Sequence, residues 1–227
     1  MSATPTVPTV LKARALLLDM DGTLVNSDAV VERIWRRWAA AHGFDAEYVL
    51  SVAHGRQAHA TLAELLPERP MEENYADNAR MLAEETSDVE GVVAVPGAPR
   101  FLESLVAGGV AHALVTSADL ALSTARMGAA GLAYPAVRVT AENVGASKPD
   151  PEGFLKGAAE LGVDPADCVV FEDSGAGIAA GCSAGMRVVG VGPRALGHGA
   201  TVCVPDLSGV RVEVLGRGEV ALHVGDV

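Results

Sequence analysis

Two carboxylates, Asp19 and Asp21, stand two positions apart directly after a hydrophobic run that ends at Leu18. The run is too short for a membrane span and is typical of a buried strand. In an open α/β sheet, ligands bind at the carboxyl ends of the strands, where these two acids would lie. Their charges need compensation, and a divalent cation with oxygen ligands would supply it. A strand-to-helix turn, with Asp19 as a helix cap, explains the same residues without any chemistry.

Other polar side chains also follow predicted strands, or lie in the loops that leave them: Thr116, Ser117, Lys148, Glu172 and Asp173. Because the ends of parallel strands meet at one edge of a sheet, these side chains should converge on the two aspartates. Each of them alone is more often structural. The order and spacing of the whole set indicate a site, and phosphoryl transfer is the chemistry that it suits.

In such a reaction a carboxylate attacks phosphorus and holds an acyl phosphate. A hydroxyl and a lysine bind the phosphoryl oxygens, whose charge must be stabilised. Further carboxylates hold Mg²⁺. A second carboxylate protonates the leaving oxygen and then activates water. The candidate residues supply each of these groups.

The elements that would position these residues alternate along the chain. Amphipathic helices, with apolar residues spaced i, i+3 and i+4, separate the strands. This alternation predicts an α/β fold, a doubly wound and mostly parallel sheet covered on both faces. A terminal β-hairpin is expected after residue 208. The strands of the sheet are predicted at 13–19, 110–116, 137–140, 168–171, 187–191 and 201–204.

The alternation is interrupted after the first strand. Ser27-Asp28 offers an N-cap for a helix, and the stretch 45–89 has helical periodicity and no strand pattern. A helical block between consecutive strands of a sheet indicates an inserted domain. We therefore predict an α/β catalytic core of residues 1–25 and 92–227, with an inserted all-α domain of residues 26–91.

Charge and composition narrow the range of partners. The chain is 49% hydrophobic and carries a net charge of −12, from 17 basic and 29 acidic residues. An acidic surface repels a phosphate backbone, so nucleic acid is not an expected partner. It would also repel a phosphorylated substrate, unless a metal and local basic residues reverse the field at the site.

Targeting signals and cysteine usage bear on location. The sequence has no apolar run long enough for a membrane helix. Residues 1–10 lack a signal-peptide pattern and are expected to be a frayed tail. Cys168, Cys182 and Cys203 are widely spaced without a C-x-x-C pattern, which predicts reduced, buried thiols. We expect a cytoplasmic protein, without membrane association, that is a monomer.

Taken together, the motifs resemble those of the haloacid dehalogenase superfamily of phosphohydrolases. The resemblance covers about residues 13–205. The helical block is similar to the small cap of the branch that contains β-phosphoglucomutase, phosphoglycolate phosphatase and bacterial sugar phosphatases. The four stretches similar to the four family motifs are, in order, Asp19-Met-Asp-Gly-Thr23, Thr116, Lys148-Pro149, and Glu172-Asp173 with Ser174-Gly-Ala-Gly177.

The resemblance implies a Rossmann-like core, a Mg²⁺ cofactor and separate roles for the two aspartates. Asp19 would be the nucleophile and a Mg²⁺ ligand. Asp21 would be the general acid/base, and its backbone carbonyl would also bind Mg²⁺. True dehalogenases of the superfamily lack the second aspartate, so Asp21 argues against dehalogenation.

The resemblance also implies roles for the other motif residues. Thr116, Ser117 and Lys148 would bind the phosphoryl group, and Lys148 would offset the charge of the carboxylates. Asp173 would complete the metal site. Glu172 would bind the metal either directly or through water, which the sequence leaves open.

Substrate specificity is expected in the cap, which in this family closes over the active site and excludes water. Gly55 would allow a turn between two cap helices, and Arg56 and Gln57 could hydrogen-bond sugar hydroxyls or a carboxylate. Arg56 is equally explained as an ordinary solvated charge. The surrounding pattern is similar to small sugar-phosphate and polyol-phosphate phosphatases. We predict a Mg²⁺-dependent phosphatase that hydrolyses a small sugar phosphate or similar monoester through an aspartyl phosphate.

Three alternatives remain. A phosphosugar mutase of the β-phosphoglucomutase type would share all four motifs, but it must clamp a second phosphate with cap cations. Cations such as Arg56, Arg69 and Arg80 are present in the cap, but it has no lysine, which favours a phosphatase. A phospho-receiver signalling module would be half as long and would lack the helical insertion. A non-catalytic family member would not need all the catalytic positions intact.

Overall fold

The computed structural model describes residues 9–53 and 58–225. Its central sheet has six parallel strands in the order β6-β5-β2-β7-β8-β9, and the strand order changes direction at β2. This arrangement confirms the predicted doubly wound α/β fold. The strands are β2 (Ala15–Leu18), β5 (Ala111–Val115), β6 (Val137–Val139), β7 (Cys168–Glu172), β8 (Arg187–Val191) and β9 (Val202–Val204).

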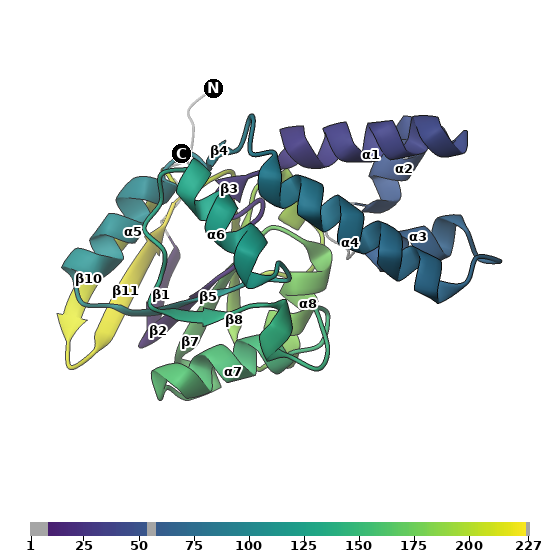
Figure 1. Ribbon diagram of the computed structural model, residues 1–227. Helices are drawn as coiled ribbons and strands as arrows, with labels where there is room; N and C mark the ends of the chain where they lie inside the picture. The colour runs from purple at the N-terminus through teal and green to yellow at the C-terminus, as the bar shows by residue number, and fades with distance from the viewer. Residues whose placement is uncertain (1–8, 54–57, 226–227) are drawn as a thin grey trace, which may run out of the picture.

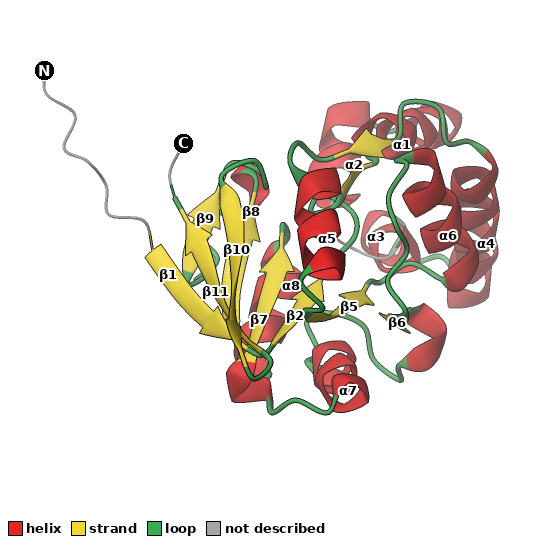
Figure 2. Ribbon diagram, turned by 90° about the vertical axis from the view of Figure 1, so that its left-hand side faces the viewer, coloured by secondary structure: helices red, strands yellow, loops and turns green. Residues whose placement is uncertain are grey.

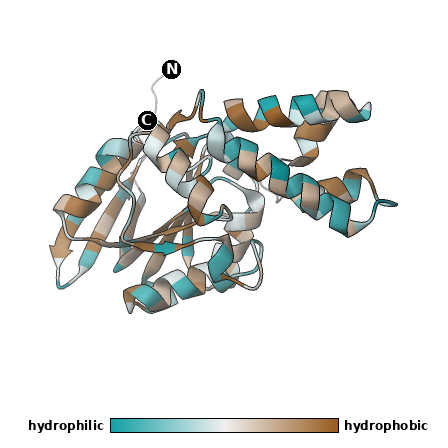
Figure 3. Cartoon of the chain, in the orientation of Figure 1, coloured by the Kyte–Doolittle hydropathy of each residue, from teal (hydrophilic) through white to brown (hydrophobic). Residues whose placement is uncertain are grey.

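Strand β2 lies between two hydrophobic cores. Leu16 and Leu18 pack in one core with α5 (Ala98–Ala107). Leu17 packs in the other, with α7 (Glu152–Leu161) and α8 (Gly175–Ser183). This division follows from the twofold side-chain alternation of a strand, and it explains why β2 reads as a continuous apolar run. In Figure 3 the central strands are accordingly mostly brown.

Four helices are inserted between β3 (Val25–Asn26) and β4 (Val93–Ala94), and Figure 1 shows them together at one side of the sheet. These two short strands pair antiparallel where this segment leaves and rejoins the sheet. Strands of two residues carry no periodic pattern, so the sequence did not predict them. The helices are α1 (Asp28–His42), α2 (Ala46–Ala53), α3 (Ala58–Leu65) and α4 (Met71–Ser87). Helix α6 (Leu120–Ala129) of the α/β part packs against α4.

A second sheet of three antiparallel strands lies beside the main one, in the order β1-β11-β10 (Figure 2). Strands β10 (Val210–Gly216) and β11 (Glu219–Val224) form the predicted terminal hairpin. Strand β1 (Thr9–Ala13) pairs with β11, so the expected frayed tail was wrong for residues 9 and 10. That pairing joins opposite ends of the chain, which local periodicity cannot reveal.

The structure bears on the predictions about the cysteines and about membrane-spanning segments. All three cysteines are free, but only Cys168 is buried, so the prediction of three buried thiols was wrong. Cys182 is exposed near the end of α8, and Cys203 is half-buried. Among the described residues, no helix has both the length and the apolar character needed to span a membrane.

Candidate active site

A cavity of about 820 Å³ opens at the carboxyl ends of β2, β5 and β7, and inserted helices form its other wall. The structure therefore brings together side chains from distant parts of the chain at the edge that the sequence predicted. Gly55, Arg56 and Gln57 lie outside the described residues, and their role stays a prediction. The predicted site residues that line the cavity are Asp19, Asp21, Thr116, Ser117, Lys148, Glu172 and Asp173.

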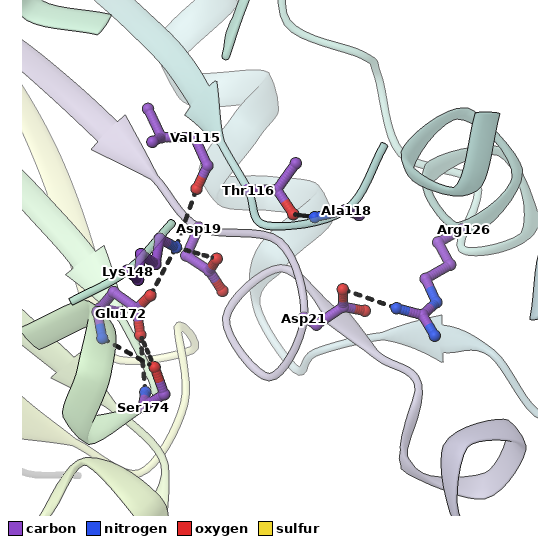
Figure 4. Close-up of polar contacts among 10 residues, drawn as sticks. Asp19, Asp21, Val115, Thr116, Ala118, Arg126, Lys148, Glu172 and Ser174 are labelled. Atoms are coloured by element: carbon purple, nitrogen blue, oxygen red, sulfur yellow. Dashed lines mark hydrogen bonds and ion pairs between the residues drawn. The ribbon is translucent and has the colours of Figure 1, made fainter. Parts of the chain in front are cut away.

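Lys148 joins the carboxylates at the centre of the site (Figure 4). Its Nζ donates hydrogen bonds to Asp19 Oδ1 at 2.6 Å, to Glu172 Oε1 at 2.7 Å and to the carbonyl of Val115 at 3.1 Å. Burial lowers the pKa of Lys148, but Asp19 and Glu172 outweigh burial, so its pKa is raised from the ordinary value. Lys148 is therefore a permanent cation between two carboxylates.

The carboxylates of the cluster carry more charge than nearby cations neutralise. Burial raises the pKa of Asp19 well above its ordinary value; Lys148 opposes this shift, and Glu172 and Asp173 add to it. The pKa of Asp173 is raised to about 7 by burial and by Glu172, against the opposing effect of Arg194. The cluster thus has a high affinity for positive charge.

Asp19, Glu172 and Asp173 fit a metal ion. All three are buried, and one oxygen from each lies within 4.8 Å of the others. Hard carboxylate oxygens at this spacing suit a divalent cation. The side chain of Asp21 points away from this group, toward Arg126 (Figure 4).

The orientation of Glu172 is fixed from two sides. Its Oε2 accepts hydrogen bonds from the backbone N–H of Ser174 at 2.7 Å and from the Ser174 hydroxyl at 3.0 Å. On its other side lies Gly177, where an added Cβ would come within 1.7 Å of Glu172 Oε1. Gly177 is therefore needed for close packing against the carboxylate.

Thr116 and Ser117 continue from the end of β5 into the cavity wall. The buried Thr116 Oγ1 accepts a hydrogen bond from the backbone N–H of Ala118 at 3.1 Å, which leaves its own proton free to donate. Ser117 is exposed toward solvent. Both hydroxyls can donate to an oxyanion beside Asp19.

Ser27 has a different role from the predicted one. It precedes α1 as its N-cap residue, but its side chain makes no capping hydrogen bond. The hydroxyl instead donates to Asp21 Oδ1 at 2.7 Å. The Ser27 hydroxyl, which an N-cap would use to accept a hydrogen bond from the helix backbone, is therefore engaged with Asp21 instead.

Two arginines at the site were not identified from the sequence. Arg126 of α6 donates to Asp21 Oδ2 at 2.8 Å and to Glu85 Oε2 of α4 at 2.6 Å. A signal was present, because Arg126 follows Leu122 by four positions on the buried face of its helix.

The other arginine, Arg194, follows β8. Its Nε lies 3.0 Å from Asp173 Oδ2, and its Nη1 lies 2.9 Å from Asp28 Oδ1 at the start of α1. Arg194 follows a predicted strand just as Asp173 does, so the same reasoning from strand ends could have identified it. Both arginines link a carboxylate of the site to a carboxylate of the inserted helices.

A parallel sheet that gathers acids, a lysine and hydroxyls at its switch point is the architecture of a hydrolase that transfers phosphoryl groups. A family model of the haloacid dehalogenase-like hydrolases matches residues 13–185. The chain belongs to this family, which confirms the predicted resemblance and the prediction that the protein is an enzyme.

Individual relatives agree with this assignment. Hexitol phosphatase A of Escherichia coli is 40% identical over 181 residues, which cover 80% of this chain and 84% of that protein. Glycerol-1-phosphate phosphohydrolase 2 of Saccharomyces cerevisiae is 35% identical over 196 residues, 82% of this chain and 77% of that one. The crystal structure of β-phosphoglucomutase from Clostridium difficile shares the fold, with a TM-score of 0.75 and 22% identity over 86% of this chain and 92% of that chain.

Proposed function

We propose that this protein is a Mg²⁺-dependent phosphatase that hydrolyses the monoester of a small sugar or sugar alcohol through an aspartyl phosphate. The observation that carries the proposal is the buried contact of Asp19 with Lys148, in a cavity that Asp21 also lines. A nucleophile with a cationic neighbour and a second aspartate for proton transfer are what such a reaction needs. The relatives named above, a hexitol phosphatase and a glycerol-1-phosphate phosphohydrolase, support the substrate class.

In this mechanism Asp19 attacks phosphorus and the ester oxygen leaves. Lys148 and the hydroxyls of Thr116 and Ser117 donate to the phosphoryl oxygens, whose charge grows in the transition state. Asp21 gives a proton to the leaving oxygen, and then takes one from the water that hydrolyses the acyl phosphate.

Asp19 and Asp173 would hold the Mg²⁺, with Glu172 as a further oxygen donor. The bound ion would supply positive charge against the phosphoryl oxygens and the carboxylates. Among the described residues, the cations paired with these three carboxylates are Lys148 and Arg194, one fewer than the acids, so a bound cation would balance the charge.

We take residues 26–91 as a cap domain and residues 1–25 and 92–227 as the core. Among the described cap residues, those that line the cavity include no arginine or lysine. Every described arginine of residues 26–91 forms an ion pair with a carboxylate of the same residues. A mutase would need free cap cations for a second phosphate, so this arrangement favours hydrolysis. The monomeric state, the cytoplasmic location and the lack of a nucleic-acid partner stay predictions.

Phosphate release from a panel of monoesters tests the proposal. The panel should include hexitol phosphates, glycerol phosphate, hexose phosphates and a non-sugar ester, each with Mg²⁺ and with a chelator. We expect release from a sugar or alditol phosphate, lost with the chelator and restored by Mg²⁺. Isomerised sugar phosphate without release would show a mutase, and no turnover of any ester would contradict both activities.

A further inference from the structure

The carboxylate of Asp21 is anchored at both oxygens. Ser27 Oγ donates to Oδ1 at 2.7 Å, and Arg126 Nη1 donates to Oδ2 at 2.8 Å. The side chain is nevertheless 32% exposed, and it lines the cavity. Asp21 is thus anchored by Ser27 and Arg126, and its partly exposed side chain lines the cavity where a substrate would bind.

Arg126 connects this carboxylate to the inserted helices. Its side chain is only 5% exposed, and its Nη2 donates to Glu85 Oε2 at 2.6 Å. Glu85 lies near the end of α4, the last inserted helix, and Ser27 directly precedes α1, the first one. The two anchors of Asp21 therefore lead to opposite ends of the inserted segment.

Two simpler roles for Arg126 fit the structure less well. Arg126 lines the cavity, but its side chain is only 5% exposed and both terminal nitrogens already bind carboxylates, which does not favour a role as a substrate ligand. As a purely structural ion pair, it would have no reason to end on Asp21. The pair between Arg69 and Asp77 shows that structural case, because it joins a partly buried arginine to a buried aspartate, and neither residue lines the cavity.

We propose that Arg126 is a positioning residue that orients Asp21 for proton transfer, and that Glu85 makes this orientation depend on the position of α4. The proposal rests on the phosphatase function proposed above. A general acid must lie within about 2.6–3.2 Å of the oxygen that it protonates. Without Arg126, one oxygen of Asp21 loses its anchor and the carboxylate can rotate away from that position.

A double-mutant cycle at positions 126 and 21, with kcat as the measured quantity, tests the proposal. In the wild-type background, Arg126→Met should lower kcat about 10- to 100-fold, the scale of a misplacement near 1 Å, with little change in KM. In an Asp21→Asn background the same change should lower kcat no further. An equal loss in both backgrounds would show a structural role, and a raised KM with unchanged kcat would show a substrate ligand; either result overturns the proposal.

Glu85 provides a second variant, which guards against misfolding. Arg126→Met leaves Glu85 buried without its cation, whereas the double variant Glu85→Gln with Arg126→Met leaves no unpaired charge at that position. Glu85→Gln alone should lower kcat less than Arg126→Met, and should add nothing once Arg126 is methionine. Additive losses at positions 85 and 126 would contradict the link to α4. Arg69→Met is the matched control: it removes a partly buried arginine of the cap, and it should lower Tm while kcat stays near the wild-type value.

Thermal unfolding separates a failure of this inference from a failure of the proposed function. If the wild type releases no phosphate from any ester of the panel, the function fails. The contact between Arg126 and Asp21 can still be tested by unfolding. Because Asp21→Asn already removes the charge that Arg126 binds, Arg126→Met should lower Tm less in that background than in the wild type. Equal losses of Tm in the two backgrounds would overturn the positioning role whatever the activity.

Discussion

The ammonium group of Lys148 lies 2.6 Å from Asp19 Oδ1, although 129 positions separate the two residues in the chain. The same nitrogen binds Glu172, and the ring of Phe154 lies beneath it at 5.1 Å. A buried cation in this position has two effects. It lowers the electrostatic cost of burying two carboxylates, and it places positive charge beside the atom that would attack phosphorus.

Replacing this cation should therefore damage both activity and stability. We expect Lys148→Met to lower kcat about 10²- to 10³-fold, the usual cost of one transition-state donor. The variant should also unfold at a lower temperature, because Asp19 and Glu172 lose their shared partner. Lys156→Met is the control, since Lys156 is half-buried outside the cavity and its ammonium donates to the backbone carbonyl of Asn143. Wild-type turnover by Lys148→Met would contradict the assigned role.

The two aspartates should differ in how much activity their variants retain. Asp19→Asn would remove the proposed nucleophile, so phosphate release should be abolished. Asp21→Asn would remove the proposed proton-transfer group, so kcat should fall about 10²- to 10⁴-fold. Phosphate release measures both changes, and circular dichroism checks folding. Asp164→Asn serves as a control, because that exposed side chain only caps a short helix. Turnover by Asp19→Asn would refute the nucleophile assignment.

The sequence predicted the sheet and its polar edge because both depend on local signals. Short apolar runs marked the strands, and the polar groups stood at their ends, as with Leu18 and Asp19, or in a loop that leaves a strand, as with Lys148. Parallel topology then brought these groups together without any knowledge of distances. The chain-spanning pairing of β1 with β11 had no such local signal.

The contacts of the inserted helices with the site were not predictable in the same way. Ser27 has the residue type and position of a helix cap, and only the position of Asp21 shows that its hydroxyl is used elsewhere. Arg126 sits on an apolar helix face, and its two carboxylate partners come from different segments. Buried ion pairs of this kind depend on tertiary geometry, which the spacing of residues does not encode.

Stability without metal should depend on pH through Asp173. Its pKa is raised from 3.8 to about 7 by burial and by Glu172, so the folded chain holds a proton that the unfolded chain releases. The contribution of this group is complete below about pH 4 and is lost as pH rises toward 7. In a chelator, the Tm of Asp173→Asn should therefore fall less between pH 5 and pH 8 than that of the wild type. Equal slopes would contradict the prediction.

Magnesium should reverse this effect in a pH-dependent manner. An ion held by Asp19 and Asp173 replaces the missing positive charge, so Mg²⁺ should raise Tm at pH 8. Below pH 7 it must displace the proton of Asp173, so its apparent affinity should fall. Titrations followed by thermal unfolding at pH 6 and pH 8 measure this difference. Asp173→Asn should lose most of the shift at pH 8, and a shift that stays at the wild-type size would exclude Asp173 as a ligand.

Gly177 offers a test of the site through packing alone. An alanine Cβ there would lie 1.7 Å from Glu172 Oε1, so the carboxylate or the start of α8 must move. We expect Gly177→Ala to lower stability by about 1–3 kcal/mol, as for an overpacked core, and to lower kcat because Glu172 turns away from Lys148. Gly128→Ala is the matched control. Gly128 also lies in a helix but meets no atom within 4 Å, so alanine should stabilise the chain by about 0.5–1 kcal/mol with kcat unchanged. Urea unfolding and phosphate release measure both variants, and wild-type kcat in a destabilised Gly177→Ala would show that the orientation of Glu172 does not matter for turnover.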